Sequence, residues 1–204
     1  TANNTVTGGD AKETVNFAAT LNNSDTVDLG GGTDTLTATV TNLTATTGAL
    51  NISNVETLNL TNAGTAVIDA TKITGASEIA VLTNTTKTTI TGLAAGTKVG
   101  LGHNNTDGDV DGILDVALAD ATGTADTLTI NFNDTAAANN STVDLRTTGV
   151  ETLVLDWTDA TDTGVADATL DVDAINAATV TITGADVDVG HALSLQTLDT
   201  DTTT

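Results

Sequence analysis

The sequence predicts an all-β fold, a parallel β-solenoid of the β-roll type with calcium-binding turns. Three observations lead to this prediction. Apolar and polar residues alternate along short segments, aliphatic positions recur at a short interval, and two sequence blocks recur in the second half of the chain. A right-handed stack of coils accounts for all three in the simplest way. A pair of Greek-key β-sandwich domains is the alternative architecture.

The alternation defines the expected strands in chain order. Val, Ile and Leu alternate with Thr, Asn and Asp, a pattern typical of strands that bury one face. The clearest segments are residues 36–40, 56–60, 88–91, 126–130 and 179–183. Clusters of Gly, Asn and Asp lie between them and indicate turns. The Ala-rich stretch 171–178 is the best candidate for a turn or two of helix.

The aliphatic centres of the middle segments are 10 or 11 positions apart, at Leu58, Ile68, Ile79, Ile90 and Leu101. One strand and one turn fit in that interval, so the spacing favours a repeated unit of this size.

Two longer blocks indicate a weak internal duplication. Asp-Thr-Leu-Thr at 34–37 recurs at 126–129, and Val-Glu-Thr-Leu at 55–58 recurs at 150–153. We therefore expect an N-terminal half over residues 1–102 and a C-terminal half over residues 103–204. The two halves are alternatively parts of one continuous solenoid.

The composition excludes several classes of function. The 204 residues include 27 acidic and 5 basic ones, for a formal net charge of −22, and 48 are Thr. Such a charge argues against binding to nucleic acid or to an anionic membrane surface. Cysteine is absent, which excludes disulfides and thiolate zinc sites. No apolar run reaches the roughly 18 residues of a membrane-spanning helix. The missing initiator Met leads us to expect a piece of a longer protein.

The first candidate metal site is a glycine-rich turn. Gly30, Gly32, Asp34 and Leu36 follow the calcium-binding nonapeptide G-G-x-G-x-D-x-U-x, with Leu29 where its first glycine would stand. Glycine exposes backbone carbonyls there, and the aspartate supplies one of the six to eight oxygens that Ca²⁺ takes. A glycine-rich turn with a surface aspartate is the alternative. Gly8-Gly9-Asp10 is expected to form the matching turn of the first coil. The expected ligands on these turns are Asp10, Asp25, Asp28, Gly30, Gly32 and Asp34.

The second candidate is D-x-D-x-D-G at 107–112, the front half of an EF-hand loop. Leu118 stands where the bidentate Glu would be, so a complete EF-hand is not expected. A calcium loop between strands and a solvated acidic turn both remain open, and Asp120 offers a further carboxylate. The expected ligands are Asp107, Asp109, Asp111, Asp115 and the carbonyl of Ile113.

An enzymatic function is not expected. The two histidines, His103 and His191, have no recognisable catalytic partner in the sequence. The chain has no nucleophile elbow, P-loop or zinc-protease motif. Ice binding through ranks of Thr would require Thr-x-Thr in register on every coil, and the spacing drifts.

Three segments carry a family resemblance: Gly-Gly-Thr-Asp-Thr-Leu-Thr at 31–37, Asn-Val-Glu-Thr-Leu-Asn-Leu-Thr at 54–61, and Gly-Val-Glu-Thr-Leu-Val-Leu at 149–155. They resemble bacterial S-layer proteins of the RTX-related, type I-secreted kind. The resemblance implies a secreted, cell-surface protein whose solenoid binds Ca²⁺ and assembles with identical copies into a lattice. It also implies RTX-like turns in the N-terminal half, with Asp34 and Asp25 in the nonapeptide ligand position.

The resemblance also bears on partners. The parent protein is expected to reach cell-surface polysaccharide through other parts of its chain, with no nucleic acid and no membrane insertion. A calcium-stabilised extender or binding domain of a large secreted RTX-type adhesin is the alternative function. In either role Ca²⁺ would neutralise turn carboxylates, and its binding free energy would become folding free energy.

Overall fold

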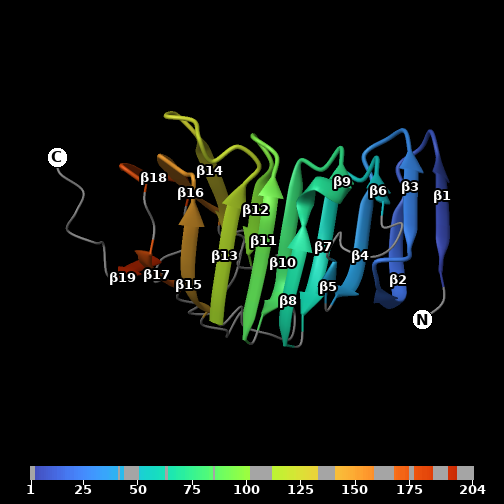
Figure 1. Ribbon diagram of the computed structural model, residues 1–204, viewed down its shortest axis with the longest axis horizontal. Helices are drawn as coiled ribbons and strands as arrows, with labels where there is room; N and C mark the ends of the chain where they lie inside the picture. The colour runs from blue at the N-terminus through green and yellow to red at the C-terminus, as the bar shows by residue number, and fades with distance from the viewer. Residues whose placement is uncertain are drawn as a thin grey trace.

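The protein is a stack of parallel strands wound into a β-solenoid (Figure 1). The computed structural model describes residues 3–40, 42–43, 51–62, 64–84, 86–101, 112–132, 141–158, 168–174, 177–185 and 193–196. Every strand pair in these ranges is parallel. The predicted solenoid is therefore confirmed, because a Greek-key sandwich pairs its strands antiparallel.

The described strands form three sheets. Sheet A contains β1 (Thr5–Gly9), β3 (Thr26–Gly30), β6 (Asn51–Ser53) and β9 (Ile73–Thr74). Sheet B contains β2 (Thr14–Leu21), β4 (Thr35–Val40), β7 (Thr57–Asn62), β10 (Glu78–Asn84), β12 (Lys98–Leu101), β14 (Thr127–Phe132), β16 (Thr152–Thr158) and β18 (Thr179–Ala185). Sheet C contains β5 (Asn42–Leu43), β8 (Thr65–Asp69), β11 (Lys87–Leu93), β13 (Gly112–Leu118), β15 (Ser141–Thr148), β17 (Ala168–Ala174) and β19 (Leu193–Gln196).

The core consists of aliphatic columns that run along the stack. Leu36, Leu58, Ile79 and Val99 lie at successive positions of one column in sheet B, and all are buried. Alternate residues of each strand point inward, so every coil adds one layer of apolar side chains. Each layer is thin, which suits a chain with only two Phe and one Trp.

The short aliphatic interval corresponds to one strand. Leu58 and Ile79 lie in sheet B, whereas Ile68 and Ile90 lie in sheet C, so consecutive centres alternate between two faces of the stack. The internal duplication has a structural counterpart in sheet B. Its two copies begin the neighbouring pairs β4–β7 and β14–β16.

The stack continues across residues 102 and 103. Strand β11 pairs with β13 in sheet C, and β12 pairs with β14 in sheet B. Both ladders therefore join strands from the two halves distinguished in the sequence.

The helix expected over residues 171–178 is wrong in its first part. Residues 171–174 belong to β17, in which Leu170 is buried opposite Val143 of the preceding coil. Pairing within the stack overrides the helical preference of alanine, because Leu170 fills a core layer. The one helical element among the described residues is the 3₁₀ turn η1 (Ala70–Lys72).

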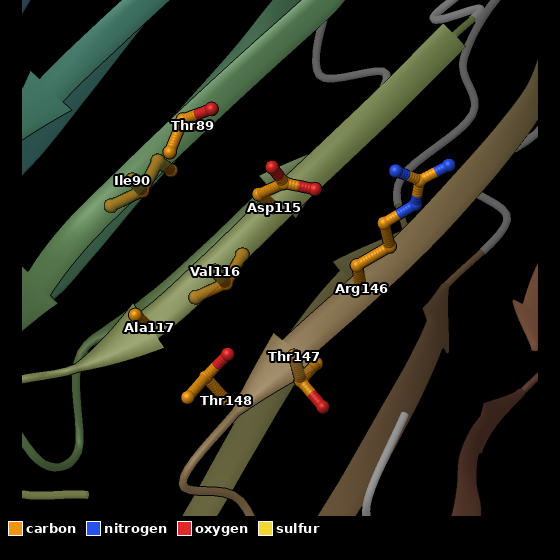
Figure 2. A pocket seen from close by; sticks show the side chains of 8 residues that line it. All are labelled: Thr89, Ile90, Asp115, Val116, Ala117, Arg146, Thr147 and Thr148. Atoms are coloured by element: carbon orange, nitrogen blue, oxygen red, sulfur yellow. The ribbon is translucent and has the colours of Figure 1, made fainter. Parts of the chain in front are cut away.

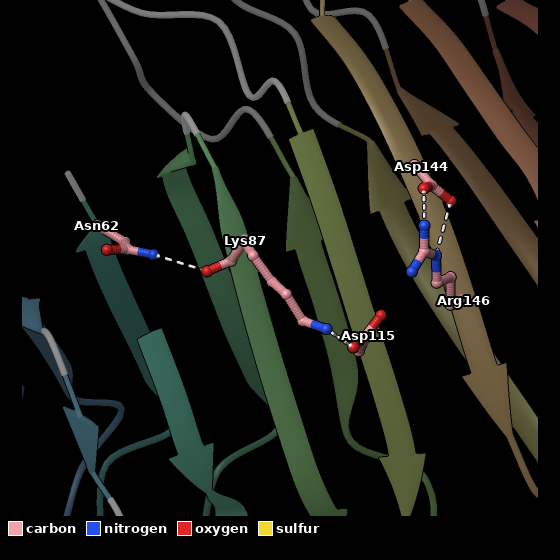
Figure 3. Close-up of polar contacts among 5 residues, drawn as sticks. All are labelled: Asn62, Lys87, Asp115, Asp144 and Arg146. Atoms are coloured by element: carbon pink, nitrogen blue, oxygen red, sulfur yellow. Dashed lines mark hydrogen bonds and ion pairs between the residues drawn. The ribbon is translucent and has the colours of Figure 1, made fainter. Parts of the chain in front are cut away.

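A buried asparagine fixes the corner between β7 and β8. The Asn62 side-chain amide donates to the carbonyl oxygen of Gly64 at 2.8 Å. It also donates to the carbonyl oxygen of Lys87 at 3.2 Å (Figure 3). Its Oδ1 accepts the Gly64 N–H at 2.9 Å. Because Lys87 belongs to the next coil, this one side chain both shapes its own corner and joins two coils.

Candidate functional site

An acidic residue precedes many strands of sheet B. Glu13, Asp34 and Glu56 stand directly before β2, β4 and β7, which pair in register, so the three acids are neighbours in consecutive coils. We call this set the first cradle. Asp126 and Glu151 stand in the same way before β14 and β16 and form the second cradle.

The carboxylates of the first cradle bond to the backbone of adjacent coils. The Glu13 N–H donates to Asp34 Oδ1 at 2.7 Å, and the Asp34 N–H donates to Glu56 Oε2 at 2.6 Å. The backbone ladder continues beside them, since the Thr57 N–H donates to the Asp34 carbonyl at 3.0 Å. Charge-assisted hydrogen bonds thus extend the coil-to-coil pairing beyond the ends of the strands.

The second cradle repeats this arrangement. The Asp126 N–H donates to Glu151 Oε2 at 2.9 Å, and the Glu151 and Thr152 N–H groups both donate to the Asp126 carbonyl at 3.0 Å. Sequence reasoning identified the recurring Glu-Thr-Leu but assigned no role to Glu56, Asp126 or Glu151. The signal was the acid placed one position before a Thr-aliphatic pair.

Both cradles contain carboxylate oxygens that have lost water without gaining a donor. Asp34 is 0% exposed, and its Oδ2 has no hydrogen-bond partner. Glu13 Oε2 and Asp126 Oδ2 are also buried and unpartnered. A desolvated carboxylate oxygen without a donor is costly to bury, so a cation beside these atoms would offset that cost.

The glycine turns predicted to match do lie against each other. The Gly31 N–H donates to the Gly9 carbonyl at 2.6 Å, and Gly9 pairs with Gly30 in sheet A. Gly30 has φ +84° and Gly32 has φ +136°. A Cβ on either would collide with a backbone carbonyl of the first coil, so this close approach requires glycine.

The predicted aspartates of the N-terminal segment separate into different places. Asp10 is exposed on the first turn, and Asp34 is enclosed on the second. Asp28 lies on the outer side of β3, where its Oδ1 accepts from the Gly30 N–H at 3.2 Å and from Asn54 Nδ2 at 2.7 Å. The structure therefore brings Asp10, Gly30, Gly32 and Asp34 together on adjoining turns.

Asp25 lies at the opposite end of β3 and does not join this group. It is fully buried, and its Oδ1 accepts from the Asn4 N–H at 2.9 Å and from Asn4 Nδ2 at 3.0 Å. Its Oδ2 accepts the Asn22 N–H at 2.8 Å. Oδ1 thus connects the first two coils, and Oδ2 holds the corner that leads into β3.

The second predicted loop is described only at its end. Asp107, Asp109 and Asp111 lie outside the described residues. Ile113 and Asp115 belong to β13, and the Asp115 carboxylate forms an ion pair with Lys87 of the neighbouring strand (Figure 3).

Farther along the chain, the carboxylate of Asp120 accepts the Thr122 hydroxyl at 2.7 Å and the Thr122 N–H at 3.0 Å, and these hydrogen bonds lower the pKa of Asp120.

A groove of about 450 Å³ crosses sheet C beside Asp115 (Figure 2). Asp115 and Arg146 face its rim from adjacent strands, and Arg146 also binds Asp144 through two contacts of 2.6 and 3.3 Å. The charges here are balanced, with Lys87 and Arg146 opposite two aspartates. This balance distinguishes the groove from the cradles, because no ion pair among the described residues places a Lys or Arg beside Glu13, Asp34 or Asp126.

A complete metal cage is not preformed in the part of the chain that the structure describes, since no three Asp, Glu or His side chains there converge on one point. The same residues contain no helix of the length and apolarity needed to cross a membrane. Comparisons with protein-family models, curated proteins and solved structures give no match to this chain.

Proposed function

We propose that this chain is a structural, non-enzymatic segment of a secreted cell-surface protein. It folds with Ca²⁺ and assembles with copies of itself into a surface layer. The proposal is supported chiefly by one observation, the fully buried Asp34 carboxylate with an unpartnered Oδ2 on a turn that only glycine permits. Asp126 repeats the unpartnered oxygen in the second half.

These residues fit a calcium ion in their chemistry. Ca²⁺ binds carboxylate and backbone carbonyl oxygens and tolerates irregular shells that include water. Asp34 Oδ2 and Glu13 Oε2 would hold it in the first cradle, and Asp126 Oδ2 in the second. The remaining ligands would be carbonyls and water, because three carboxylates do not converge there among the described residues.

The charge of the molecule gives the ion an energetic role. A formal net charge of −22 on a thin stack opposes compaction through self-repulsion. A cation that binds the folded form alone contributes stability by mass action, about 2.7 kcal/mol at a hundredfold excess over Kd. Folding would then follow the calcium concentration of the compartment.

Calcium titration followed by thermal unfolding tests this proposal. We expect Ca²⁺ to raise Tm by several degrees relative to EGTA, and we expect Asp34→Asn combined with Asp126→Asn to remove that increase. Asp144→Asn is the matched control, since it deletes an acid that already pairs with Arg146. Equal melting curves in Ca²⁺ and EGTA would exclude the calcium role.

Electron microscopy of the calcium-loaded protein tests the assembly. Ordered two-dimensional sheets support a surface layer. Separate rods that never form sheets would replace it with the extender of a large secreted adhesin.

A further inference from the structure

The outer face of sheet C carries balanced charges in the middle of the stack. Two bases and two acids alternate there with buried residues on the neighbouring strands β11, β13 and β15: Lys87, Asp115, Asp144 and Arg146 (Figure 3). Their side chains are between 27% and 43% exposed. Copies of a chain with a formal net charge of −22 repel each other, so a face with balanced charges allows a closer approach.

The strand register places these charges at two levels of the sheet. At the first level, Asp115 of β13 lies opposite Arg146 of β15. At the second level, Lys87 of β11 and Asp171 of β17 lie one strand farther out, with Asp144 between them. Each level therefore has opposite charges at equal distances on either side of the line between β13 and β15.

Asp171 stands opposite another acid within the sheet. It pairs in register with Asp144, and like charges at directly opposite positions are destabilising. Arg146 binds Asp144, whereas no ion pair among the described residues places a Lys or Arg beside Asp171. A base supplied by another molecule would therefore relieve this repulsion.

The groove beside Asp115 has room for a side chain from outside. Its volume is about 450 Å³, and the short side chains of Thr89, Ala117 and Thr148 line it together with Asp115 (Figure 2). Arg146 stands at the rim, and its side chain is 43% exposed. One face thus presents both an exposed base and a hollow with an acid beside it.

We infer that two copies of this chain pack face to face through sheet C. A two-fold axis parallel to the strands, between β13 and β15, relates them. This rotation keeps the two levels in place and exchanges the two sides of the stack. Asp115 of one copy then faces Arg146 of the other, and Lys87 faces Asp171 in the same way. The inference rests on the proposed self-assembly and names one contact between the copies.

The charge pattern favours this axis over one that runs across the strands. An axis across the strands places each strand opposite itself, so at the first level Asp115 would face Asp115 and Arg146 would face Arg146. Midway between the levels, it would match only Asp144 with Arg146. A contact made of exposed ion pairs is weak and screened by salt, so we expect an association that added NaCl weakens.

Sedimentation velocity at low ionic strength, over a range of concentrations, tests the contact. We expect wild-type protein to associate as its concentration rises, and we expect Arg146→Glu to weaken association at least tenfold because the new acid faces Asp115. Lys98→Glu is the matched control, since it reverses a base that pairs with an aspartate on sheet B at 3.7 Å. Retained association in Arg146→Glu, or an equal loss in Lys98→Glu, would overturn the inference.

A charge-swap experiment tests the symmetry of the contact. Arg146→Glu and Asp115→Arg should each fail to associate alone, whereas their mixture should form a one-to-one complex because every altered charge then faces its opposite. Circular dichroism checks that both variants are folded. If Asp115→Arg is not folded, Lys87→Glu with Asp171→Lys provides the same swap at the second level. Folded variants that do not form the mixed complex would overturn the inference.

The two proposals fail separately. Two-dimensional sheets that persist in Arg146→Glu would overturn this contact and leave the surface-layer function intact. Mixed complexes that form equally in Ca²⁺ and EGTA, together with an unchanged Tm, would support the contact and overturn the calcium role. Wild-type protein that stays monomeric at every concentration in low salt would overturn the contact directly.

Discussion

At the residue scale, three acids that stand before strands of sheet B, Asp34, Glu56 and Glu151, act as extra rungs of the backbone ladder. Glu56 holds the Asp34 amide in the same way as Glu151 holds the Asp126 amide. The Val-Glu-Thr-Leu motif therefore has a distinct role at each position. Valine is buried at the corner, glutamate binds the preceding coil, threonine faces outward and leucine enters the core.

Replacement of Glu56 measures the value of this contact. Glu56→Ala leaves the Asp34 N–H without its acceptor and should destabilise the protein by about 1–3 kcal/mol. Glu56→Gln keeps an oxygen in place and should cost less than half as much. Urea unfolding measures both, with the outward-facing Thr57→Ala as control. Equal losses in the Ala and Gln variants would show that the hydrogen bond is not the cause.

The sequence singles out Asp34 as a candidate site residue but does not reveal its hydrogen-bond partners. The nonapeptide spacing points to Asp34 because the local backbone of such a turn selects glycine and aspartate at fixed positions. Glu56 lies 22 positions away, and its bond to Asp34 exists only after the coils stack in register. Asp25 shows the converse, since an acid of the same local pattern is occupied by Asn4 and Asn22.

At the element scale, the turn after β3 is the most constrained connection described. Gly30→Ala and Gly32→Ala each place a Cβ against a carbonyl of the first coil at positive φ. A Cβ at Gly31 would meet only Asp10, at 3.6 Å from its Cα and 3.7 Å from its Oδ1, which are ordinary contacts. We expect the first two to lower Tm by several degrees and Gly31→Ala to change it little. A comparable loss in all three would refute the steric explanation.

The core columns set the cost of truncation within a strand. Leu36 is fully buried between Val15 and Leu58 of the adjacent coils. Leu36→Ala should cost about 2–5 kcal/mol, because a stacked layer closes poorly around a cavity. The outward neighbour Thr37 should tolerate alanine within about 0.5 kcal/mol. Denaturant midpoints at constant slope provide the comparison.

Strand positions were predictable from the sequence where one face is apolar and the other polar. The buried residues Leu58, Ile79 and Ile90 mark where the strands lie and how far apart they are in the sequence. They do so because a strand with one buried face has apolar residues at every second position. Residues 171–174 were misassigned, since the local alanine content conceals the single buried Leu170.

The rank of outward-facing threonines that ice binding would require is interrupted. Thr14, Thr35 and Thr57 lie in register on successive coils, but Glu78 and Lys98 occupy the next two positions.

At the scale of the whole molecule, repulsion among the acidic side chains opposes the stacking of the coils. The acids are distributed over a long, narrow stack, so each coil experiences the charge of its neighbours. Salt screens such repulsion over about 10 Å at 0.1 M.

In EGTA, added NaCl should therefore raise Tm progressively. In saturating Ca²⁺ the same salt should have a smaller effect, because the buried carboxylates are already neutralised. Circular dichroism melts at matched ionic strengths provide the measurement, with KCl as a second salt. A salt effect of equal size in both conditions would show that repulsion among the cradle carboxylates does not limit the stability of the protein.

The strands of the stack run across its long axis (Figure 1). A pulling force along that axis would load the bonds between coils one row at a time, in a peeling geometry that resists poorly. The chain would lengthen in steps as successive coils detach from an end, and each detached coil would wind back when the force falls. A segment built in this way would lengthen gradually under tension and would not lose all of its coils at once.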